Sequence, residues 1–294
     1  MNPVPAVGRF APSPTGDLHF GSLVSAVGSY LEARTAGGSW LIRIEDIDPP
    51  REIAGSANRI IADLDRLGLT PDGPVLYQST RLDAYQAAVD KLLESGLAYA
   101  CACSRKDLSE SGKYMGTCRN GIPPGKPPRS IRLRVDAGVC TFSDKLQGEV
   151  SESPAETTGD FVIRRADGLF AYQLAVVVDD QFQGITQVVR GADLLDSTNR
   201  QIYLQKTLGF VTPEYMHLPI VVSADGKKLS KRVQTDPVAR QEPASAVTQA
   251  LRFLGHNPPT GLTLDALWEW ALVHWDSSRI PRIKTSLPGI ELPA

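Results

Sequence analysis

The amino-acid sequence predicts an α/β protein with a parallel central sheet. Within the first 96 residues, apolar strands at 7–10 and 40–44 alternate with helices, and the first helix follows a loop rich in proline and glycine. This order of strand, loop, helix, strand and helix is typical of parallel strands joined by crossover helices. Strand-like segments return after residue 160, so we expect the α/β pattern to continue there.

The elements of this first part follow from residue type and spacing. Between residues 21 and 34 the apolar side chains fall at helical spacing; they are Leu23, Val24, Val27, Tyr30 and Leu31. Gly37 and Gly38 then stop the helix. The next strand is Trp-Leu-Ile-Arg-Ile at 40–44. An amphipathic helix at 53–67 ends at Gly68, and a third helix starts at Ser79 or Thr80 and ends near Gly96.

Residues 97–160 break the α/β pattern, so we interpret them as an insertion that divides the domain into halves at 1–96 and 161–235. The insertion carries three clustered cysteines and a run of proline and glycine at 121–128. Its short strands are predicted at 131–135 and 148–150.

The second half and the tail contain the remaining predicted elements. Strand-like segments are expected at 161–164, 169–178 and 217–222, and a helix capped by Asp196 or Ser197 runs to Leu208. Residues 236–294 form a short tail that looks helical at 244–254 and 264–275.

Composition and charge bound the class of protein. The chain has 42% hydrophobic and 22% charged residues, which is typical of globular proteins. A net charge of −2 gives no overall basic footprint, so any nucleic-acid contact must come from a local patch. The first residues lack the pattern of a signal peptide, and apolar runs are much shorter than the roughly 20 residues that span a bilayer. We therefore expect a cytoplasmic protein without a membrane segment.

A loop that runs into the first helix is a candidate phosphate site. The run Pro12-Ser13-Pro14-Thr15-Gly16-Asp17-Leu18-His19-Phe20-Gly21-Ser22 ends where the helix begins. Free backbone N–H groups and the helix dipole favour an anion there, and Gly21 permits close approach of the backbone. His19 is placed to donate to phosphate oxygens, although a lone histidine is as often an ordinary surface residue.

A lysine-rich loop, Lys227 to Arg232, follows the strand predicted at 217–222. After a turn signal such as Asp225-Gly226, a charge run is usually a solvated face. Its position late in an α/β chain nevertheless suits it to close on a triphosphate, where Lys228 and Lys231 would neutralise developing charge. Competing phosphate and dinucleotide motifs are missing from the sequence.

These two segments resemble the "HIGH" and "KMSKS" signatures of class I aminoacyl-tRNA synthetases, whose catalytic domain is a Rossmann-like parallel sheet. The likeness to glutamyl-tRNA synthetases is closer and covers about residues 7–235. It is carried by the stretches 9–16, 43–48, 172–180 and 189–193. The chain departs from the two signatures at Ser22, Leu229 and Arg232, as glutamyl-type enzymes commonly do.

The resemblance implies a glutamate pocket and an ATP site. The implied glutamate pocket comprises Arg9, Phe10, Ala11, Pro12, Ser13, Glu45, Tyr172 and Arg190, and the implied ATP site comprises His19, Gly21, Ser22, Lys228, Ser230 and Lys231, with His19, Lys228 and Lys231 as catalytic residues. Side-chain chemistry agrees, because Arg9 and Arg190 can clamp carboxylates and Glu45 can bind an ammonium group. Alternatively, Glu45 and Asp46 are ion-paired with Arg43 or Arg51.

Cys101, Cys103 and Cys118 form a compact cluster with the spacing of a structural zinc site. Chemistry alone would favour Cys140 as the fourth ligand, because it is a soft thiolate. The resemblance implies Tyr114 instead. The remaining alternative is a set of reduced cysteines that bind no metal.

Residues 233–294 are too few for the long helical anticodon-binding region of glutamyl-tRNA synthetases. The chain therefore resembles their truncated paralogues. The resemblance implies activation of L-glutamate with ATP and Mg²⁺ in the absence of tRNA, and transfer to queuosine in tRNA(Asp). We expect a monomer. A local RNA patch is suggested by six basic residues of the insertion, which are equally well explained as solvated charge: Arg105, Lys106, Lys113, Arg119, Lys126 and Arg129.

Two other functions are weighed against this one. The first is charging of tRNA(Glu) at its 3′-end, which the short tail disfavours. The second is a catalytically silent RNA-binding module that carries zinc, which the presence of His19, Arg190 and Lys231 disfavours.

Overall fold

The computed structural model describes residues 5–221, 238–283 and 285–286 of the chain. The lysine-rich loop with Lys228, Ser230 and Lys231 lies outside these residues. Among the described residues, no helix is both long enough and apolar enough to cross a bilayer.

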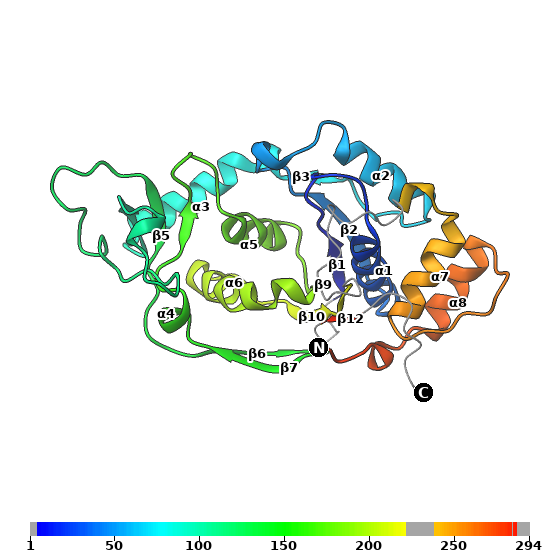
Figure 1. Cartoon of the computed structure of the whole chain (residues 1–294). Coiled ribbons are helices and arrows are strands. Elements are labelled where there is room, and N and C mark those ends of the chain that lie inside the picture. Colours follow the sequence, from blue (N-terminus) through cyan, green and yellow to red (C-terminus); the bar gives the residue numbers. More distant parts are fainter. Residues whose placement is uncertain (1–4, 222–237, 284, 287–294) are drawn as a thin grey trace.

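A seven-stranded, mostly parallel sheet forms the centre of the molecule (Figure 1). Its order is β3-β2-β1-β9-β10-β6-β7, and only the β6–β7 pair is antiparallel. The strands are β1 Val7–Phe10, β2 Ser39–Ile44, β3 Leu76–Tyr77, β6 Cys140–Asp144, β7 Gly148–Glu152, β9 Gln187–Gly191 and β10 Glu214–Leu218. The predicted strands at 7–10 and 40–44 are confirmed, and so is the class of fold.

Helix α1, Phe20–Thr35, packs against this sheet and begins one residue before its predicted start. The face of α1 that packs on the sheet is apolar and buried, and the helix approaches the sheet closely. A Cβ atom on Gly28 would lie 2.7 Å from Leu218 Cδ1 of β10, so any larger residue there would have to displace the buried Leu218 side chain. Helix α2, Ser56–Arg66, is also amphipathic, and Leu67 and Gly68 end it.

The described part of the tail contains two helices that lie beyond α1 at one end of the molecule (Figure 1). They are α7, Pro243–Phe253, and α8, Leu264–His274, which confirms the two predicted helical segments. Their buried residues belong to the same core cluster as α1 and β1, so this part of the tail is packed onto the domain.

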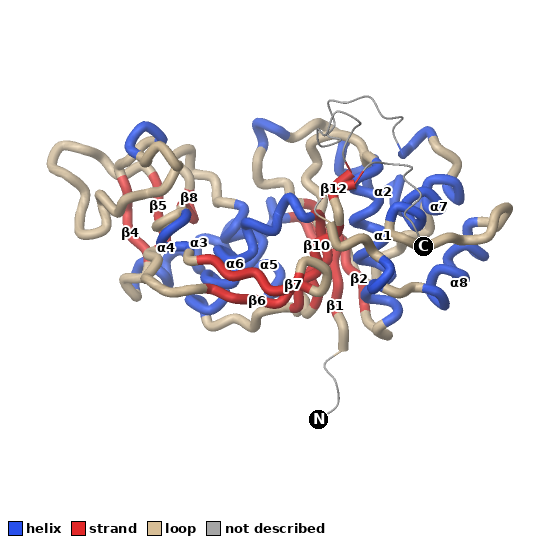
Figure 2. The backbone as a smooth tube through the Cα atoms, turned by 60° about the horizontal axis from the view of Figure 1, so that its bottom comes forward, coloured by secondary structure: helices blue, strands red, loops and turns tan. Residues whose placement is uncertain are grey.

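A second lobe lies at the opposite end and has its own three-stranded antiparallel sheet (Figure 2). Its strands are β4 Ala98–Cys101, β5 Ser130–Leu133 and β8 Val162–Arg164, and helices α3 Leu82–Glu94 and α4 Pro154–Thr157 pack with them. Helices α5 Tyr172–Phe182 and α6 Leu195–Leu208 share this core cluster and also contact the central sheet. The predicted insertion contributes to both sheets. Its β4 and β5 pair within the lobe, whereas the β6–β7 hairpin extends the central sheet.

The strand expected at 169–178 is wrong, because most of this segment forms helix α5. The error has a physical cause. Every residue from Gln173 to Asp180 is buried, so the helix has no polar face and shows no helical periodicity. A continuous apolar run of this kind fits a buried strand and a buried helix equally well. The run of β-branched residues Val176 to Val178 favoured the strand.

Other boundaries also shift. The predicted strand at 217–222 is divided into β10 and a short β11, Ile220–Val221, which pairs with β12, Thr285–Ser286. Helix α6 begins at Leu195 after Leu194, without the side-chain cap expected from Asp196 or Ser197. Strand β9 was not predicted as a strand. The short 3₁₀ helices are Pro49–Arg51, Gln78–Arg81, Arg105–Asp107, Ala192–Leu194, Val238–Arg240 and Ser277–Arg279.

The packing of α8 predicts that Trp268 anchors the tail. Its side chain is 8% exposed, its indole N–H donates to Leu67 O at 2.8 Å, and its ring meets Tyr30 edge-on. We expect Trp268→Ala to lower the free energy of unfolding by about 3–5 kcal/mol, measured by urea denaturation. Val273→Ala on the same helix is the control, because Val273 is 78% exposed. An equal, small effect of both changes on the free energy of unfolding would contradict the role of Trp268 as an anchor of the tail.

Candidate active site

A cavity of about 480 Å³ opens at the carboxyl ends of strands β1, β2, β9 and β10. The chain proceeds from β1 outward to β2 on one side and from β9 to β10 on the other, so the cavity lies where the strand order reverses. Open α/β sheets bind ligands at such a point. The cavity brings together every residue of the predicted glutamate and ATP sites that the structure describes: Arg9, Phe10, Ala11, Pro12, Ser13, His19, Gly21, Ser22, Glu45, Tyr172 and Arg190.

A second cavity of about 610 Å³ lies at the amino ends of the same strands, near Ala6, Gln187 and Glu214. It is larger, but it contains none of the predicted site residues and faces the wrong edge of the sheet for ligand binding. We therefore assign the candidate site to the smaller cavity.

His19 caps the amino end of α1 at the floor of the cavity. Its Nδ1 accepts a hydrogen bond from the Ser22 backbone N–H at 3.2 Å, and its Nε2 lies 3.0 Å from Ser22 Oγ. Because Nδ1 accepts, the neutral ring carries its proton on Nε2. The backbone N–H of Ser22, expected to face an anion, is thus engaged by His19. Ser22 also contacts the imidazole through its hydroxyl.

Two buried arginines enter the cavity from neighbouring parallel strands. Arg9 on β1 is 3% exposed and Arg190 on β9 is 6% exposed. Arg9 Nε donates to Asp180 Oδ1 at 3.1 Å, and Arg190 Nη1 lies 3.4 Å from the Tyr172 hydroxyl. Two guanidinium groups at one edge of the sheet make this cavity suited to a carboxylate or phosphate ligand.

Glu45 follows β2 and gives the cavity one acidic group. Its Oε1 lies 3.4 Å from Arg43 Nη2, so the alternative of an ion pair with Arg43 is confirmed. Burial raises the pKa of Glu45 more than the charges of Arg43 and Arg9 lower it. The two arginines therefore do not offset the full cost of burying the Glu45 charge.

The alternative partner Arg51 is wrong for both acidic residues, because Arg51 pairs with Asp48. Asp46 instead accepts from the backbone N–H and hydroxyl of Ser79, at the start of the 3₁₀ helix before α3.

Asp180 and Arg43 are site-supporting residues that the sequence analysis did not assign. Asp180 Oδ1 accepts from Arg43 Nη1 at 2.7 Å as well as from Arg9. Although burial opposes it, the charges of Arg9 and Arg43 lower the pKa of Asp180. The available signal was the pair Asp179-Asp180 in an apolar run, since buried charges need partners. Asp179 has its own partners, including Tyr85 at 2.5 Å.

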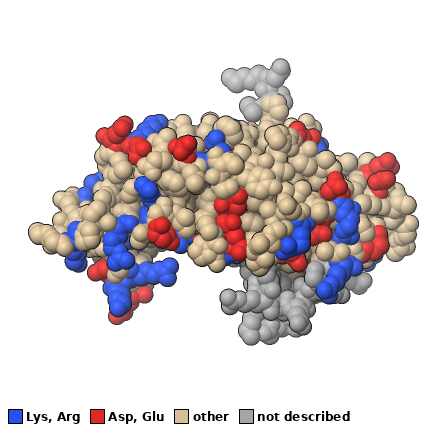
Figure 3. All heavy atoms as spheres, turned by 90° about the horizontal axis from the view of Figure 1, so that it is seen from above, with Lys and Arg blue, Asp and Glu red and all other residues tan. Residues whose placement is uncertain are grey.

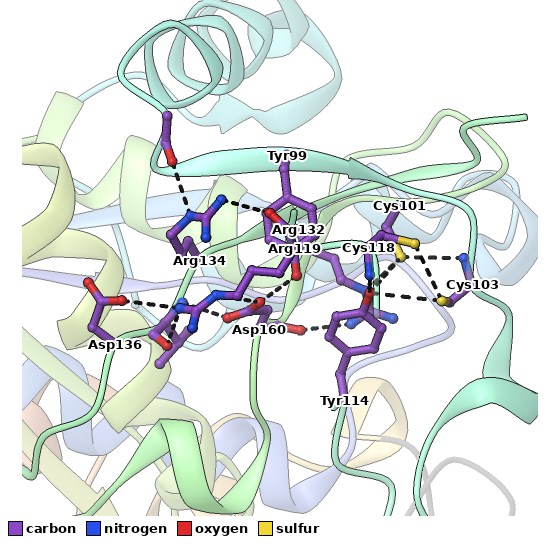
Figure 4. A network of polar contacts seen from close by, with 12 residues as sticks. Tyr99, Cys101, Cys103, Tyr114, Cys118, Arg119, Arg132, Arg134, Asp136 and Asp160 are labelled. Carbon is purple, nitrogen blue, oxygen red and sulfur yellow. Dashed lines mark hydrogen bonds and ion pairs between the residues drawn. The ribbon is translucent and has the colours of Figure 1, made fainter. Parts of the chain in front are cut away.

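The three predicted cysteines converge near Tyr114 in the second lobe (Figure 4). Cys103 Sγ lies 3.6 Å from Cys118 Sγ, and the Tyr114 hydroxyl lies 3.4 Å from Cys101 Sγ and 3.8 Å from Cys103 Sγ. Zinc–sulfur bonds of about 2.3 Å place the sulfurs of a tetrahedral site about 3.8 Å apart. The donor atoms therefore fit a zinc ion in both chemistry and spacing.

Cys140 is excluded as the fourth ligand, because it packs in a different cluster with Ile185 and Val188 of the central sheet. The hydroxyl of Tyr114 accepts from the Cys118 backbone N–H at 2.8 Å. Arg132 donates to Cys101 Sγ at 3.3 Å and lies over the Tyr114 ring. Although burial opposes it, the contacts with Tyr114, the Cys103 backbone N–H and Arg132 lower the pKa of Cys101, whereas burial raises the pKa of Tyr114.

The candidate RNA residues lie at this same end, where Figure 3 shows Lys and Arg side chains with acidic ones among them. Arg105, Lys106, Lys126 and Arg129 are exposed. Arg119 is different, because its guanidinium pairs with Asp136 and Asp160 and so has a structural role.

Comparisons with known proteins agree with this geometry. Residues 6–260 match the family of class I tRNA synthetases (E and Q), catalytic domain. The chain is 53% identical over 290 residues to a Glutamyl-Q tRNA(Asp) synthetase of Dechloromonas aromatica, covering 95% of this chain and 96% of the relative. A relative with the same name from Pseudomonas aeruginosa PAO1 is 53% identical over 283 residues, covering 95% and 96%.

A solved structure is similar over most of the chain. It is a glutamate tRNA ligase from Elizabethkingia meningosepticum, crystallised in complex with its amino acid, with a TM-score of 0.81 and 25% identity. The match covers 97% of this chain and 67% of that one. The chain thus belongs to the class I tRNA synthetase family of the glutamyl and glutaminyl type, and it is a ligase. Within that family its near full-length relatives are glutamyl-Q tRNA(Asp) synthetases.

The contacts of Asp180 predict its effect on stability. Asp180→Asn preserves shape but leaves two buried guanidinium groups without their shared anion, so we expect unfolding to cost about 3–5 kcal/mol less. The exposed pair Asp167 and Arg165 supplies the control Asp167→Asn, which should change stability by less than about 1 kcal/mol.

The lowered pKa of Asp180 also determines how stability depends on pH. The contribution of Asp180 to the free energy of unfolding is present above the ordinary carboxyl pKa range, and it is lost as pH falls through the pKa of the folded state. Urea denaturation at several pH values measures both effects. A wild-type curve that runs parallel to that of Asp180→Asn would contradict the assignment.

Proposed function

We propose that the chain activates L-glutamate with ATP in the absence of tRNA and transfers it to the cyclopentene-diol of queuosine at the wobble position of tRNA(Asp). The observation that carries this proposal is the cavity itself. It combines two buried arginines, the buried carboxylate of Glu45 and a helix amino terminus within one space. The names of the most similar relatives supply the queuosine step.

In this proposal, glutamate lies between the two arginines and Glu45. Arg9 and Arg190 bind carboxylate oxygens, and the Tyr172 hydroxyl adds a polar contact. Glu45 binds the ammonium group, whose positive charge would offset part of the cost of burying the carboxylate. The backbone turn after β1, which holds Phe10, Ala11, Pro12 and Ser13, lines the adjacent wall.

ATP is proposed to bind between the start of α1 and the lysine-rich loop. His19, Gly21 and Ser22 line the cavity from below, and Lys228, Ser230 and Lys231 would close from above. The described residues on either side of that loop support this. Val221 lines the cavity, and the backbone N–H of Val238 donates to Leu18 O, whose residue lines it too.

The first reaction step is then an attack by the glutamate α-carboxylate on the α-phosphorus of ATP. A carboxylate–phosphorus bond forms, the bond to the β-phosphate bridge breaks, and pyrophosphate leaves with Mg²⁺ neutralising its charge. The protein supplies alignment of the two reactants and positive charge at the phosphates.

In the second step, a hydroxyl of a vicinal diol attacks the carbonyl carbon of glutamyl-adenylate. An ester forms, AMP leaves with the electron pair of the cleaved acyl–oxygen bond, and the hydroxyl proton is released to the phosphate of AMP. A tRNA 3′-end and the queuosine cyclopentene both present vicinal diols, so one cavity can serve either acceptor. The exposed basic residues of the second lobe would contact the RNA backbone.

We also propose that Cys101, Cys103, Tyr114 and Cys118 hold a structural zinc ion. Bound zinc would cross-link a segment of low secondary-structure content within the insertion at 97–160. The proposed division treats 1–96 and 161–235 as halves of the catalytic domain and 236–294 as a short helical segment that braces it.

The function is tested by labelled glutamate. We expect glutamate-dependent exchange of pyrophosphate into ATP without tRNA, followed by labelling of queuosine-modified tRNA(Asp). The control is the same tRNA without queuosine, which should remain unlabelled. Labelling of tRNA(Glu), or equal labelling of both forms of tRNA(Asp), would overturn the queuosine step. An absence of exchange would leave an RNA-binding module.

The metal assignment predicts about one zinc per purified chain by atomic absorption. Cys118→Ser should lose the metal and lower the melting temperature, because the ion holds its segment in place. Cys140→Ser is the matched control, since Cys140 lies in the central-sheet cluster, and it should retain the metal. Full zinc content in Cys118→Ser would refute this ligand set.

A further inference from the structure

Arg190 is held by side chains that the proposed reaction does not use. Its Nε donates to His217 Nε2 at 3.0 Å, and its Nη2 donates to Thr198 Oγ1 at 2.8 Å. Its Nη1 makes a longer contact of 3.4 Å with the Tyr172 hydroxyl, which lines the cavity. The two shorter contacts, to His217 and Thr198, are made by Nε and Nη2, whereas Nη1 faces Tyr172.

The hydrogen bonds of His217 define its protonation state. A guanidinium N–H can only donate, so Nε2 of His217 must accept and the ring proton must lie on Nδ1. That nitrogen lies 2.6 Å from Asp144 Oδ2, which accepts a hydrogen bond from the Nδ1–H group. Both side chains are fully buried. The geometry therefore describes a neutral imidazole with one defined tautomer between a carboxylate and a guanidinium.

Asp144 is itself rigidly held at the end of β6. Its Oδ1 accepts from the backbone N–H groups of Leu146, Gln147 and His217, at 3.0, 2.9 and 3.2 Å. Strand β6 runs parallel to β10, and β10 pairs His217 directly with Arg190 of β9. Three adjacent strands thus supply one residue each to a series of contacts that ends at Arg190 in the cavity.

We propose that Asp144 and His217 form a positioning pair, in which Asp144 sets the tautomer of His217 and His217 aims the Arg190 guanidinium at the carboxylate of the amino-acid substrate. The inference rests on the proposed function, because it takes Arg190 as a carboxylate ligand. Nη2 also donates to Leu194 O at 3.4 Å, so Nη1 is the nitrogen that faces the substrate. A guanidinium donates along fixed directions in its plane, so loss of the Nε anchor turns Nη1 away from the carboxylate and weakens substrate binding.

Protonation of His217 would destroy this arrangement. An N–H on Nε2 would point at the N–H of Arg190 and add a second positive charge. The charged or titratable groups that face His217 are Asp144 from β6, Arg190 from β9, Arg9 from β1 and Tyr215 of its own strand. Burial and then the charge of Arg190 lower the pKa of His217, although the hydrogen bond to Asp144 opposes them.

Two amide substitutions separate the two nitrogens of the ring. The amide of His217→Asn reaches the position of Nδ1, so it keeps the donor to Asp144 and loses the acceptor for Arg190. The longer side chain of His217→Gln reaches the position of Nε2, where its oxygen accepts from Arg190. The measurement is the KM for glutamate and for ATP in pyrophosphate exchange without tRNA.

We expect His217→Asn to raise the KM for glutamate about tenfold or more, with the KM for ATP nearly unchanged, because one hydrogen bond to a charged group is lost. His217→Gln should recover most of this loss. In the wild type, the KM for glutamate should rise as pH falls through the lowered pKa of His217. It should stay flat in His217→Gln, which has no titrating ring.

An unchanged KM for glutamate in His217→Asn, or equal losses in both variants, overturns the positioning pair while the wild-type exchange upholds the proposed function. A wild type without glutamate-dependent exchange removes the proposed function and this inference with it. Should His217→Asn fail to fold, the pH profiles decide: identical profiles of the wild type and His217→Gln refute the pair.

Discussion

The carboxylate of Asp180, set between the guanidinium groups of Arg9 and Arg43, is the interaction on which the cavity depends. It joins helix α5 to strands β1 and β2, and each of the three side chains is buried. Two buried cations without this anion would repel each other and face a large desolvation cost. Because Arg43 also contacts Glu45, the same contact determines where the acidic and basic walls of the cavity lie.

Much of the cavity was predictable because its residues are close together in sequence. Strand β1, the loop after it and the start of α1 carry local signals of spacing, glycine and proline. The support behind these residues was not predictable in the same way. Helix α5 is buried on all sides and so lacks periodicity, and Asp144 reaches His217 only because the β6–β7 hairpin joins the far edge of the sheet.

The cysteine cluster shows the same division between local pattern and tertiary contact. Spacing alone identified Cys101, Cys103 and Cys118, but it left Tyr114 and Cys140 as competing partners. The choice between them follows from topology. Cys140 begins β6 and is carried into the core of the central sheet, whereas Tyr114 remains beside the thiols in the second lobe.

The pairing of β11 with β12 gives the end of the described chain a second structural role, in addition to packing against the domain. Ile220 and Val221 are the last described residues before the lysine-rich loop, and they lie in register with Thr285 and Ser286. The point where that loop departs is thereby tethered by a segment more than sixty positions away in sequence. Truncation just before Thr285 would remove the strand that pairs with Ile220 and Val221, while every described side chain that lines the cavity would remain in the protein.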